Sequence, residues 1–245
     1  MLRAVARAVQ PASAASTASA ASAASAARAA RAARAARATG STRSFLSFGP
    51  PTKVAGPRHL EILRNAAARQ EKMGVREGAA EVAETATVAC GCFWGVELAF
   101  QRVPGVGGTK VGYTSGHDPN PTYESVCSGR SGHTEAVQIS FQPDIVSFSE
   151  LLDIFWDIHD PTTLNRSGND IGTQYRSGIY YHSDAQRATA ELSLAEEQKC
   201  LSSKIVTEVL PASAFFDAEP VHQRYLERGG QSASKVCLDP IRCYG

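Results

Sequence analysis

The chain lacks several features that would place it quickly in a class of protein. No run of apolar residues is long enough to cross a membrane, so no membrane-spanning segment is expected. No glycine-rich phosphate loop or dinucleotide fingerprint occurs, which argues against a bound nucleotide or flavin. The six cysteines are too sparse in 245 residues for a disulfide scaffold, and they suit a reducing compartment. Any redox chemistry would therefore have to use these few thiols.

Acidic residues are absent from the first 60 positions, although the whole chain has a formal net charge of only +1. That segment holds eight arginines and one lysine and so carries +9, whereas the remaining 185 residues carry −8. It is rich in alanine and serine, and Arg28, Arg31, Arg34 and Arg37 recur every three residues. This composition is typical of an organellar transit peptide, for a plastid or a mitochondrion.

A nucleic-acid-binding arm is the alternative interpretation of this basic segment. The arginine repeat contains no aromatic residue for base stacking, so targeting is favoured and no nucleic-acid partner is expected. We expect the leader and a Pro/Gly-rich linker to occupy residues 1–60 and a helical lead-in to occupy 61–84. A folded domain follows at 85–228, and residues 229–245 form an irregular tail.

Hydrophobic periodicity predicts an α+β domain after the leader. The predicted order of its elements is β-α-β-β-α-β, which is that of a split βαβ, ferredoxin-like plait, with one helix and one strand appended. The strands are expected at 85–90, 109–113, 135–141, 178–182 and 205–209, and the helices at 59–73, 93–102, 149–158, 184–200 and 220–228.

Cys92 lies in the pentapeptide Gly91-Cys92-Phe93-Trp94-Gly95, between a predicted strand and a predicted helix. On the first turn of a helix, the unpaired N–H groups and the dipole favour a thiolate over a thiol. A buried structural cysteine is the alternative interpretation. Cys90 and Cys92 form one Cys-x-Cys pair, but no second Cys/His pair stands at ligand spacing, so no metal site is predicted.

Three segments in this order resemble the A-type peptide methionine sulfoxide reductases: 91–95, 132–137 (Gly-His-Thr-Glu-Ala-Val) and 168–177 (Gly-Asn-Asp-Ile-Gly-Thr-Gln-Tyr-Arg-Ser). The resemblance runs from Thr85 to Gly245, and the ending 239–245 resembles the plant-type branch. It implies a ferredoxin-like plait and an enzyme that reduces methionine S-sulfoxide, both free and in oxidised proteins. It also implies a monomer that has no bound cofactor and takes its electrons from thioredoxin.

The resemblance further implies catalytic roles for four residues. Cys92 would attack the sulfoxide sulfur and become a sulfenic acid. If Glu135 lines an apolar pocket, desolvation would keep it protonated and able to protonate the sulfoxide oxygen. The hydroxyls of Tyr123 and Tyr175 would donate hydrogen bonds to the same oxygen. Without the resemblance, an exposed surface glutamate and surface tyrosines would be the ordinary interpretation.

Phe93 and Trp94 would form an apolar slot for the substrate methyl group, although core packing is the common role of aromatic residues. Asp170 would accept a hydrogen bond from an ordered water or from the substrate backbone. His159-Asp160 raises the rival of a Cys-His-Asp hydrolase. The flanking residues 161–165 belong to the reductase-like pattern, so His159 is expected to be structural.

Cys237 and Cys243 lie in the tail and are expected to resolve the sulfenic acid of Cys92 and to present a disulfide to thioredoxin. The sequence leaves open which of the two reaches Cys92 first. Cys127, in a loop, and Cys200, at a helix end, are expected to behave as small apolar residues.

Overall fold

The computed structural model describes residues 56–74 and 83–243. The predicted leader, apart from its last residues, lies outside the described residues. None of the helices in the described part has the length and apolar character that crossing a membrane requires.

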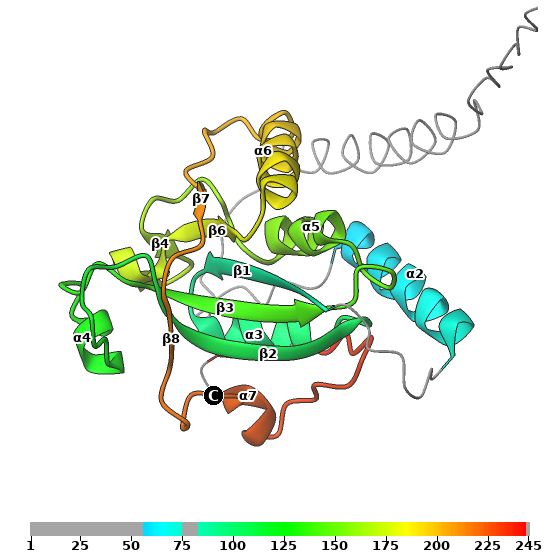
Figure 1. The fold of residues 1–245 in the computed structure, drawn as a ribbon, viewed down its shortest axis with the longest axis horizontal. Coiled ribbons are helices and arrows are strands. Elements are labelled where there is room, and N and C mark those ends of the chain that lie inside the picture. Colours follow the sequence, from blue (N-terminus) through cyan, green and yellow to red (C-terminus); the bar gives the residue numbers. More distant parts are fainter. Residues whose placement is uncertain (1–55, 75–82, 244–245) are drawn as a thin grey trace, which may run out of the picture. The chain divides into compact units, whose positions relative to one another are not determined.

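A six-stranded sheet forms the centre of the domain (Figure 1). Its strands lie in the order β7-β6-β1-β3-β2-β8, and the inner neighbours β6, β1, β3 and β2 all pair antiparallel. This order is that of a split βαβ plait, so the α+β fold predicted from the sequence is confirmed. The edge strand β7 pairs parallel to β6, and β8 pairs antiparallel to β2. The strands span Glu84–Cys90 (β1), Val106–Thr114 (β2), Thr134–Phe141 (β3), Ser177–Tyr181 (β6), Glu208–Pro211 (β7) and Phe215–Asp217 (β8).

Burial alternates along the second half of β3, as the sequence predicts. On β3, Val137 and Ile139 are fully buried, whereas Ser140 is exposed. This face joins the main hydrophobic core, to which Phe100 and Phe155 contribute from two helices. Since successive strand residues point to opposite faces, Glu135 shares the inward-facing set with Val137 and Ile139.

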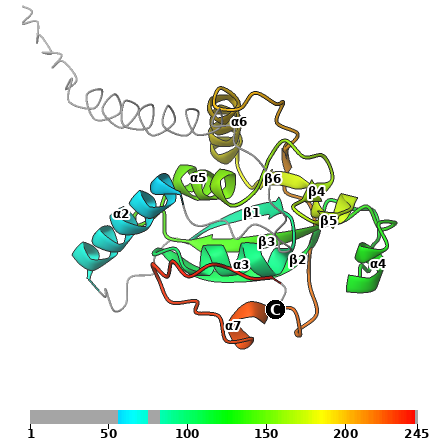
Figure 2. The ribbon, with the colours of Figure 1, turned by 180° about the vertical axis from the view of Figure 1, so that it is seen from behind.

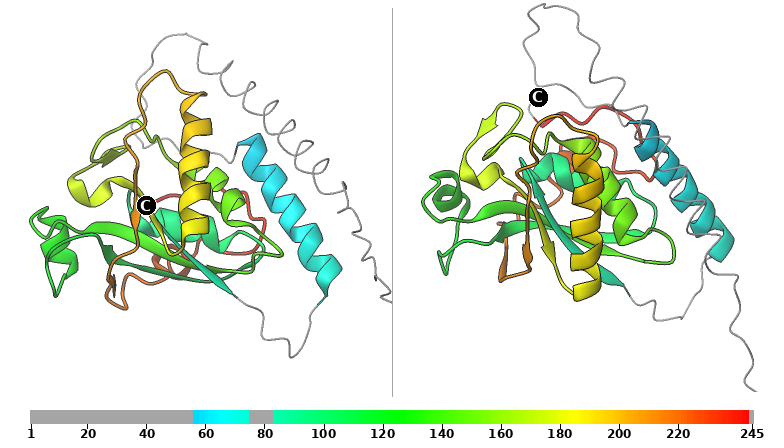
Figure 3. Two further views of the ribbon diagram at one scale, coloured as in Figure 1. Left: turned by 45° about the horizontal axis from the view of Figure 1, so that its top comes forward. Right: turned by 90° about the horizontal axis from the view of Figure 1, so that it is seen from above.

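Four longer helices surround the sheet: α2 (Pro57–Met73), α3 (Phe93–Gln101), α5 (Phe148–Ile158) and α6 (Asp184–Gln198). Ser147 and Glu150 form a capping box at the start of α5, which fixes where that helix begins. Helix α5 lies between α2 and α6 (Figure 3). Ile62 and Leu63 of α2 are buried in the core, and Arg69 pairs with Glu150 at 2.7 Å. Helix α2 is therefore part of the folded domain.

Several short elements were not predicted. They are α4 (Tyr123–Cys127), the hairpin β4 (Arg166–Ser167) and β5 (Asp170–Ile171), a 3-10 turn at Thr173–Tyr175, and β8. Each is too short to carry a periodic pattern.

Two predicted elements have different bounds. The last predicted strand, at 205–209, lies at 208–211 because the N–H groups of Ile205 and Val206 bond Gln198 Oε1 and Pro161 O instead of a strand. The helix expected at 220–228 shortens to α7 (Tyr225–Arg228). Gln223 is engaged with the backbone of Val111 on β2, which draws this stretch out of a helix.

The irregular tail runs alongside α3, as the view from behind shows (Figure 2). Val236 N–H bonds the carbonyl of Arg102, the residue after the last turn of α3. At the other end of the same helix, Cys243 lies against Gly95. The tail is thus an ordered part of the domain through Cys243.

Candidate active site

Cys92 occupies the turn between β1 and α3, where it is the N-cap residue of the helix. Gly91, just before it, has φ of 108°, and a Cβ there would lie 2.4 Å from Cβ of Ser167. Only glycine allows the β4–β5 hairpin to close on this turn. Ser167 Oγ donates a hydrogen bond to the carbonyl of Cys90 at 3.1 Å, which fixes the hairpin there. Cys92 itself is half-buried.

The protonation state of Cys92 differs from the sequence-based prediction of a thiolate. The hydrogen bond to Cys243, burial and the Glu135 carboxyl together raise the pKa of Cys92 well above its usual value. The backbone N–H of Trp94 acts in the opposite direction but is outweighed. The prediction was wrong because desolvation and neighbouring acidic groups count for more here than the helix terminus. At rest Cys92 is a neutral thiol.

Glu135 lies on β3 with only 1% of its surface exposed. Its Oε2 accepts a hydrogen bond of 3.0 Å from the backbone N–H of Phe93, the residue after Cys92. Burial, with smaller contributions from Asp170 and Cys243, raises the pKa of Glu135 to about 8. The carboxyl is therefore protonated at neutral pH, and it can donate a hydrogen beside the thiol.

Tyr123 and Tyr175 approach one another around the thiol of Cys127, to which both hydroxyls are hydrogen-bonded. Burial raises the pKa of each phenol above its usual range, so both remain proton donors. The expectation that Cys127 behaves as a small apolar residue was wrong. A four-residue spacing places Tyr123 and Cys127 on one side of α4, and that spacing is the signal that could have revealed the contact.

A cluster of aromatic rings includes the two residues that follow Cys92. Phe93 and Trp94 both belong to this cluster, together with Tyr123. His222 lies 4.4 Å from the Tyr123 ring and Tyr225 lies 4.1 Å from the Trp94 ring, measured between centroids. His222 and Tyr225 were not identified from the sequence, where the i, i+3 spacing of an imidazole and a phenol was their only signal. Burial lowers the pKa of His222, which keeps its ring neutral.

Asp170 lies on β5, in the hairpin that closes on Gly91, and it is half-buried. Its negative charge raises the pKa of Glu135, of Tyr175 and of Cys243. Asp170 therefore lies close to these groups.

The two tail cysteines lie differently. A Cβ added to Gly95 would come within 2.6 Å of Cys243 Sγ, so the absence of a side chain there makes room for this thiol beside Cys92. The contact with Cys92 lowers the pKa of Cys243, which is the more readily ionised thiol of the pair. Cys237 lies six residues earlier, in a turn where its N–H bonds Ser234 O at 3.1 Å.

Residues 84–242 match the family described as peptide methionine sulfoxide reductase. The chain belongs to this family. Peptide methionine sulfoxide reductase A2-1 of Oryza sativa subsp. japonica is 58% identical over 167 residues, covering 68% of this chain and 89% of that protein. The chloroplastic A4 reductase of Arabidopsis thaliana is 57% identical over 165 residues, covering 65% of this chain and 64% of that protein. Mxr1 of Saccharomyces cerevisiae, in its reduced form, is 39% identical with a TM-score of 0.58, covering 61% of this chain and 87% of that one.

This methionine sulfoxide reductase is of the A type, and its reaction is the thiol-dependent reduction of methionine S-sulfoxide to methionine. The rival hydrolase does not fit the geometry of His159. Its Nδ1 bonds Phe155 O at 2.8 Å and its Nε2 bonds Ser177 Oγ at 2.7 Å. Both ring nitrogens thus have structural partners, Nδ1 within α5 and Nε2 on β6. In the described part of the reductase, no group of three or more His, Cys, Asp or Glu side chains is arranged to hold a metal ion.

Proposed function

We propose that Cys92 is the nucleophile and Glu135 the general acid of the reductase. Glu135 protonates the sulfoxide oxygen while the sulfur of Cys92 attacks the sulfoxide sulfur, and the Cys92 proton replaces the one that Glu135 gave up. The new S–S bond and the substrate S–O bond then break, the hydroxyl passes to the Cys92 sulfur, methionine leaves, and Cys92 remains as a sulfenic acid. The observation that carries this assignment is the buried, neutral Glu135 carboxyl, held by the N–H next to Cys92.

The tyrosines and the aromatic cluster bind the substrate. Tyr123 and Tyr175 donate hydrogen bonds to the sulfoxide oxygen, as neutral phenols do. Phe93 and Trp94 enclose the substrate methyl group, and Tyr225 backs the Trp94 ring at 4.1 Å. Trp94 Nε1 is buried without a hydrogen-bond partner among the described residues, so it is a further donor for the substrate. Asp170 accepts a hydrogen bond from the substrate backbone.

Cys243 resolves the sulfenic acid before Cys237. Its thiolate attacks the Cys92 sulfur, a disulfide forms as the S–O bond breaks, and the hydroxyl leaves as hydroxide, which takes a proton from solvent to become water. Cys237 then attacks the Cys243 sulfur, which frees the Cys92 thiol and leaves a Cys237–Cys243 disulfide for the thioredoxin dithiol to reduce. The support is that Cys243 is already hydrogen-bonded to Cys92 and has the lowered pKa of the two.

The segments of the chain divide these tasks. Residues 84–228 hold the reductase site, and 229–243 carry the recycling thiols, so one chain contains the complete cycle and works as a monomer on free methionine sulfoxide and on oxidised proteins. The leader ends before Pro57, because α2 begins there and packs on α5.

The leader directs the protein to a plastid. The relative from Arabidopsis thaliana that is named chloroplastic supports this destination. Residues 1–60 fused to a fluorescent protein should co-localise with a plastid marker. Mitochondrial fluorescence would overturn the plastid assignment, and diffuse fluorescence would overturn targeting itself.

The activity is tested by incubating the protein separately with the S and the R epimer of a methionine sulfoxide, with dithiothreitol as reductant. Methionine should form from the S epimer and depend on the reductant. A hydrolase would act on esters or amides without reductant, and a binding module for oxidised peptides would retain its ligand after Cys92→Ser. Absence of methionine from the S epimer would exclude the proposed reaction.

A further inference from the structure

The C-terminal end of α3 holds the tail whose thiol reaches the N-terminal end of the same helix. Arg102 follows the last turn of α3 and is only 4% exposed. Its Nε donates to Ser232 O at 2.9 Å and its Nη1 to Asp239 O at 2.6 Å, while its own carbonyl accepts from Val236 N–H at 2.9 Å. Arg102 therefore binds the tail on both sides of Cys237.

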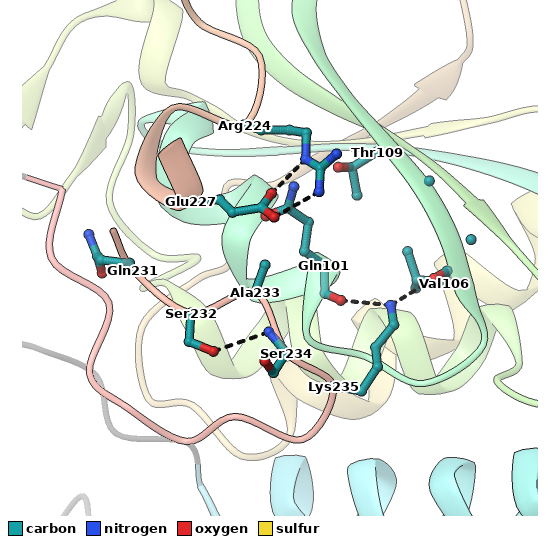
Figure 4. A pocket seen from close by; sticks show the side chains of 12 residues that line it. Gln101, Val106, Thr109, Arg224, Glu227, Gln231, Ser232, Ala233, Ser234 and Lys235 are labelled. Carbon is teal, nitrogen blue, oxygen red and sulfur yellow. Dashed lines mark hydrogen bonds and ion pairs between the residues drawn. The ribbon is translucent and has the colours of Figure 1, made fainter. Parts of the chain in front are cut away.

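Lys235 makes a reciprocal contact from the tail to the body of the domain. Its Nζ donates to Gln101 O and to Val106 O, both at 2.7 Å, as Figure 4 shows. Gln101 is the last residue of α3 and Val106 the first of β2. A cation at this point satisfies a free carbonyl and complements the helix dipole.

The tail is not packed tightly between these attachments. A cavity of about 640 Å³ is lined by residues 231–235, and its walls mix polar and apolar groups, including the Arg224–Glu227 ion pair (Figure 4). Polar bonds, more than apolar packing, hold this part of the chain. Val236 has φ of 62°, a conformation that costs a β-branched residue roughly 1–3 kcal/mol. Such a conformation persists only while its surroundings hold it.

The part of the tail that follows Asp239 is long enough to reach from the C-terminal end of α3 to Cys92. Helix α3 has nine residues and is about 14 Å long. The four residues that follow Asp239 span at most roughly 14 Å when extended. Gln231 fixes the residue before Cys243, because its side chain bonds both the carbonyl and the N–H of Arg242, at 2.6 and 3.0 Å. An attachment at Asp239 therefore delivers Cys243 to Cys92, whereas a detached tail would sample a much larger volume.

We propose that Arg102 and Lys235 form a tail latch, which places Cys243 for attack on the sulfenic acid of Cys92. They are positioning residues for recycling and do not take part in sulfoxide reduction. The proposal rests on the proposed function of Cys243 as the first resolving thiol. The Arg102 guanidinium binds main-chain carbonyls of the tail, and the Lys235 ammonium of the tail binds main-chain carbonyls of the domain, so the two residues fix the path of the tail from both sides.

The test compares Arg102→Gln and Lys235→Met with the control Lys199→Met, which changes an exposed lysine of α6 that pairs with Glu196. Each reduced protein receives one equivalent of substrate without reductant. Methionine formation and loss of Cys92 and Cys243 thiols are followed by quenched alkylation and mass spectrometry, with dimedone to trap sulfenic acid. Methionine should form at the control rate in all three. Disulfide formation should slow about tenfold in Arg102→Gln and about threefold in Lys235→Met, with more dimedone adduct, because the effective concentration of Cys243 falls.

Disulfide formation at the control rate in both variants would overturn the latch. Should Arg102→Gln fail to fold, the exposed Lys235→Met decides the question by itself. Cys243→Ser, measured in parallel, separates the two proposals. If that variant still forms the Cys92 disulfide at full rate, the assignment of Cys243 fails. If it blocks the disulfide while both latch variants behave like the control, only the latch fails.

Discussion

The two ends of helix α3 are built from different kinds of contact. At the N-terminal end, Cys92 lies beside the buried Glu135 and a cluster of aromatic rings. The hydrogen bond to Cys243 and desolvation raise the pKa of Cys92, and desolvation raises the pKa of Glu135. At the C-terminal end, Arg102 and Lys235 bind main-chain carbonyls beside a cavity. The first arrangement suits bond-making chemistry, which needs neutral acids and excluded water. The contacts at the C-terminal end suit a tail that brings the Cys243 thiol to Cys92 and later moves it away again.

The largest expected effect comes from Cys92→Ser. This change removes the thiol that attacks the substrate and that the tail cysteine later attacks. No methionine should form with dithiothreitol or with thioredoxin, because a hydroxyl is far less nucleophilic than a thiol or thiolate at neutral pH. Chromatographic measurement of methionine over many enzyme equivalents checks this, with Cys200→Ser as the matched control. Residual turnover in Cys92→Ser would rule out the mechanism at both ends of the helix.

Cys243→Ser should distinguish sulfoxide reduction at the N-terminal end of α3 from the recycling that the tail carries out. The first reduction should proceed and yield about one methionine per enzyme, after which thioredoxin-driven cycling should stop because the sulfenic acid meets no resolving thiol. Cys237→Ser should instead accumulate the Cys92–Cys243 disulfide, detectable by peptide mapping. Replacing both tail cysteines should likewise leave one turnover. Undiminished thioredoxin-driven cycling in the double variant would show that the tail is not the resolver.

Glu135→Gln should slow sulfoxide reduction, the step at the N-terminal end of α3, and leave recycling unchanged. The amide keeps the shape and a hydrogen-bond donor but has no transferable proton, so reduction should slow by roughly 10²–10⁴-fold. Single-turnover formation of methionine measures this step, and reaction of the pre-formed sulfenic acid with Cys243 should keep its rate. A reduction rate within threefold of the unchanged protein would remove Glu135 from the role of acid.

The pH dependence of reduction should be the smallest effect near neutrality. The pKa of Glu135 is about 8, so its proton is present below that pH and is lost as the pH rises through it. Single-turnover rates in Cys243→Ser should be level between pH 6 and 7 and should then fall about tenfold per unit above 8. The fall around pH 8 should be missing in Glu135→Gln. A rate that increases from pH 6 to 8 would mean that the thiolate, formed before proton transfer, is the reacting species.

The sequence predicted the order of the long elements because each has a hydrophobic period of its own. The alternation of Val137 and Ile139 with polar neighbours located β3, and the spacing of Leu151, Ile154 and Phe155 located α5. Short elements such as α4 and the β4–β5 hairpin escaped prediction, since they are held by caps and by contacts with distant turns. The strand predicted at Ile205 was displaced because a buried loop also uses apolar residues.

The residues of the candidate site also fall into two groups, those that motifs in the sequence predicted and those that only the structure revealed. Motifs in the sequence pointed to Cys92, Glu135, Tyr123, Tyr175, Asp170 and the tail thiols, and the structure brings most of these close to one another. It adds Cys127, from the same short helix as Tyr123, and His222 and Tyr225, from a later segment of the chain. His222 and Tyr225 are distant in sequence from the rings that they contact, so local reasoning could not connect them.

The sequence by itself determined the family, the α+β class and the basic character of the first 60 residues, and it predicted which thiol is reactive, because these depend on local motifs and on composition. Tertiary structure alone decided that Cys92 rests as a thiol, that Glu135 is protonated, and that Cys243 is the tail cysteine in contact with Cys92. The reason is physical: a pKa depends on desolvation and on charges brought from distant segments. Likewise, the reach of a tail depends on where Arg102 and Lys235 fasten it.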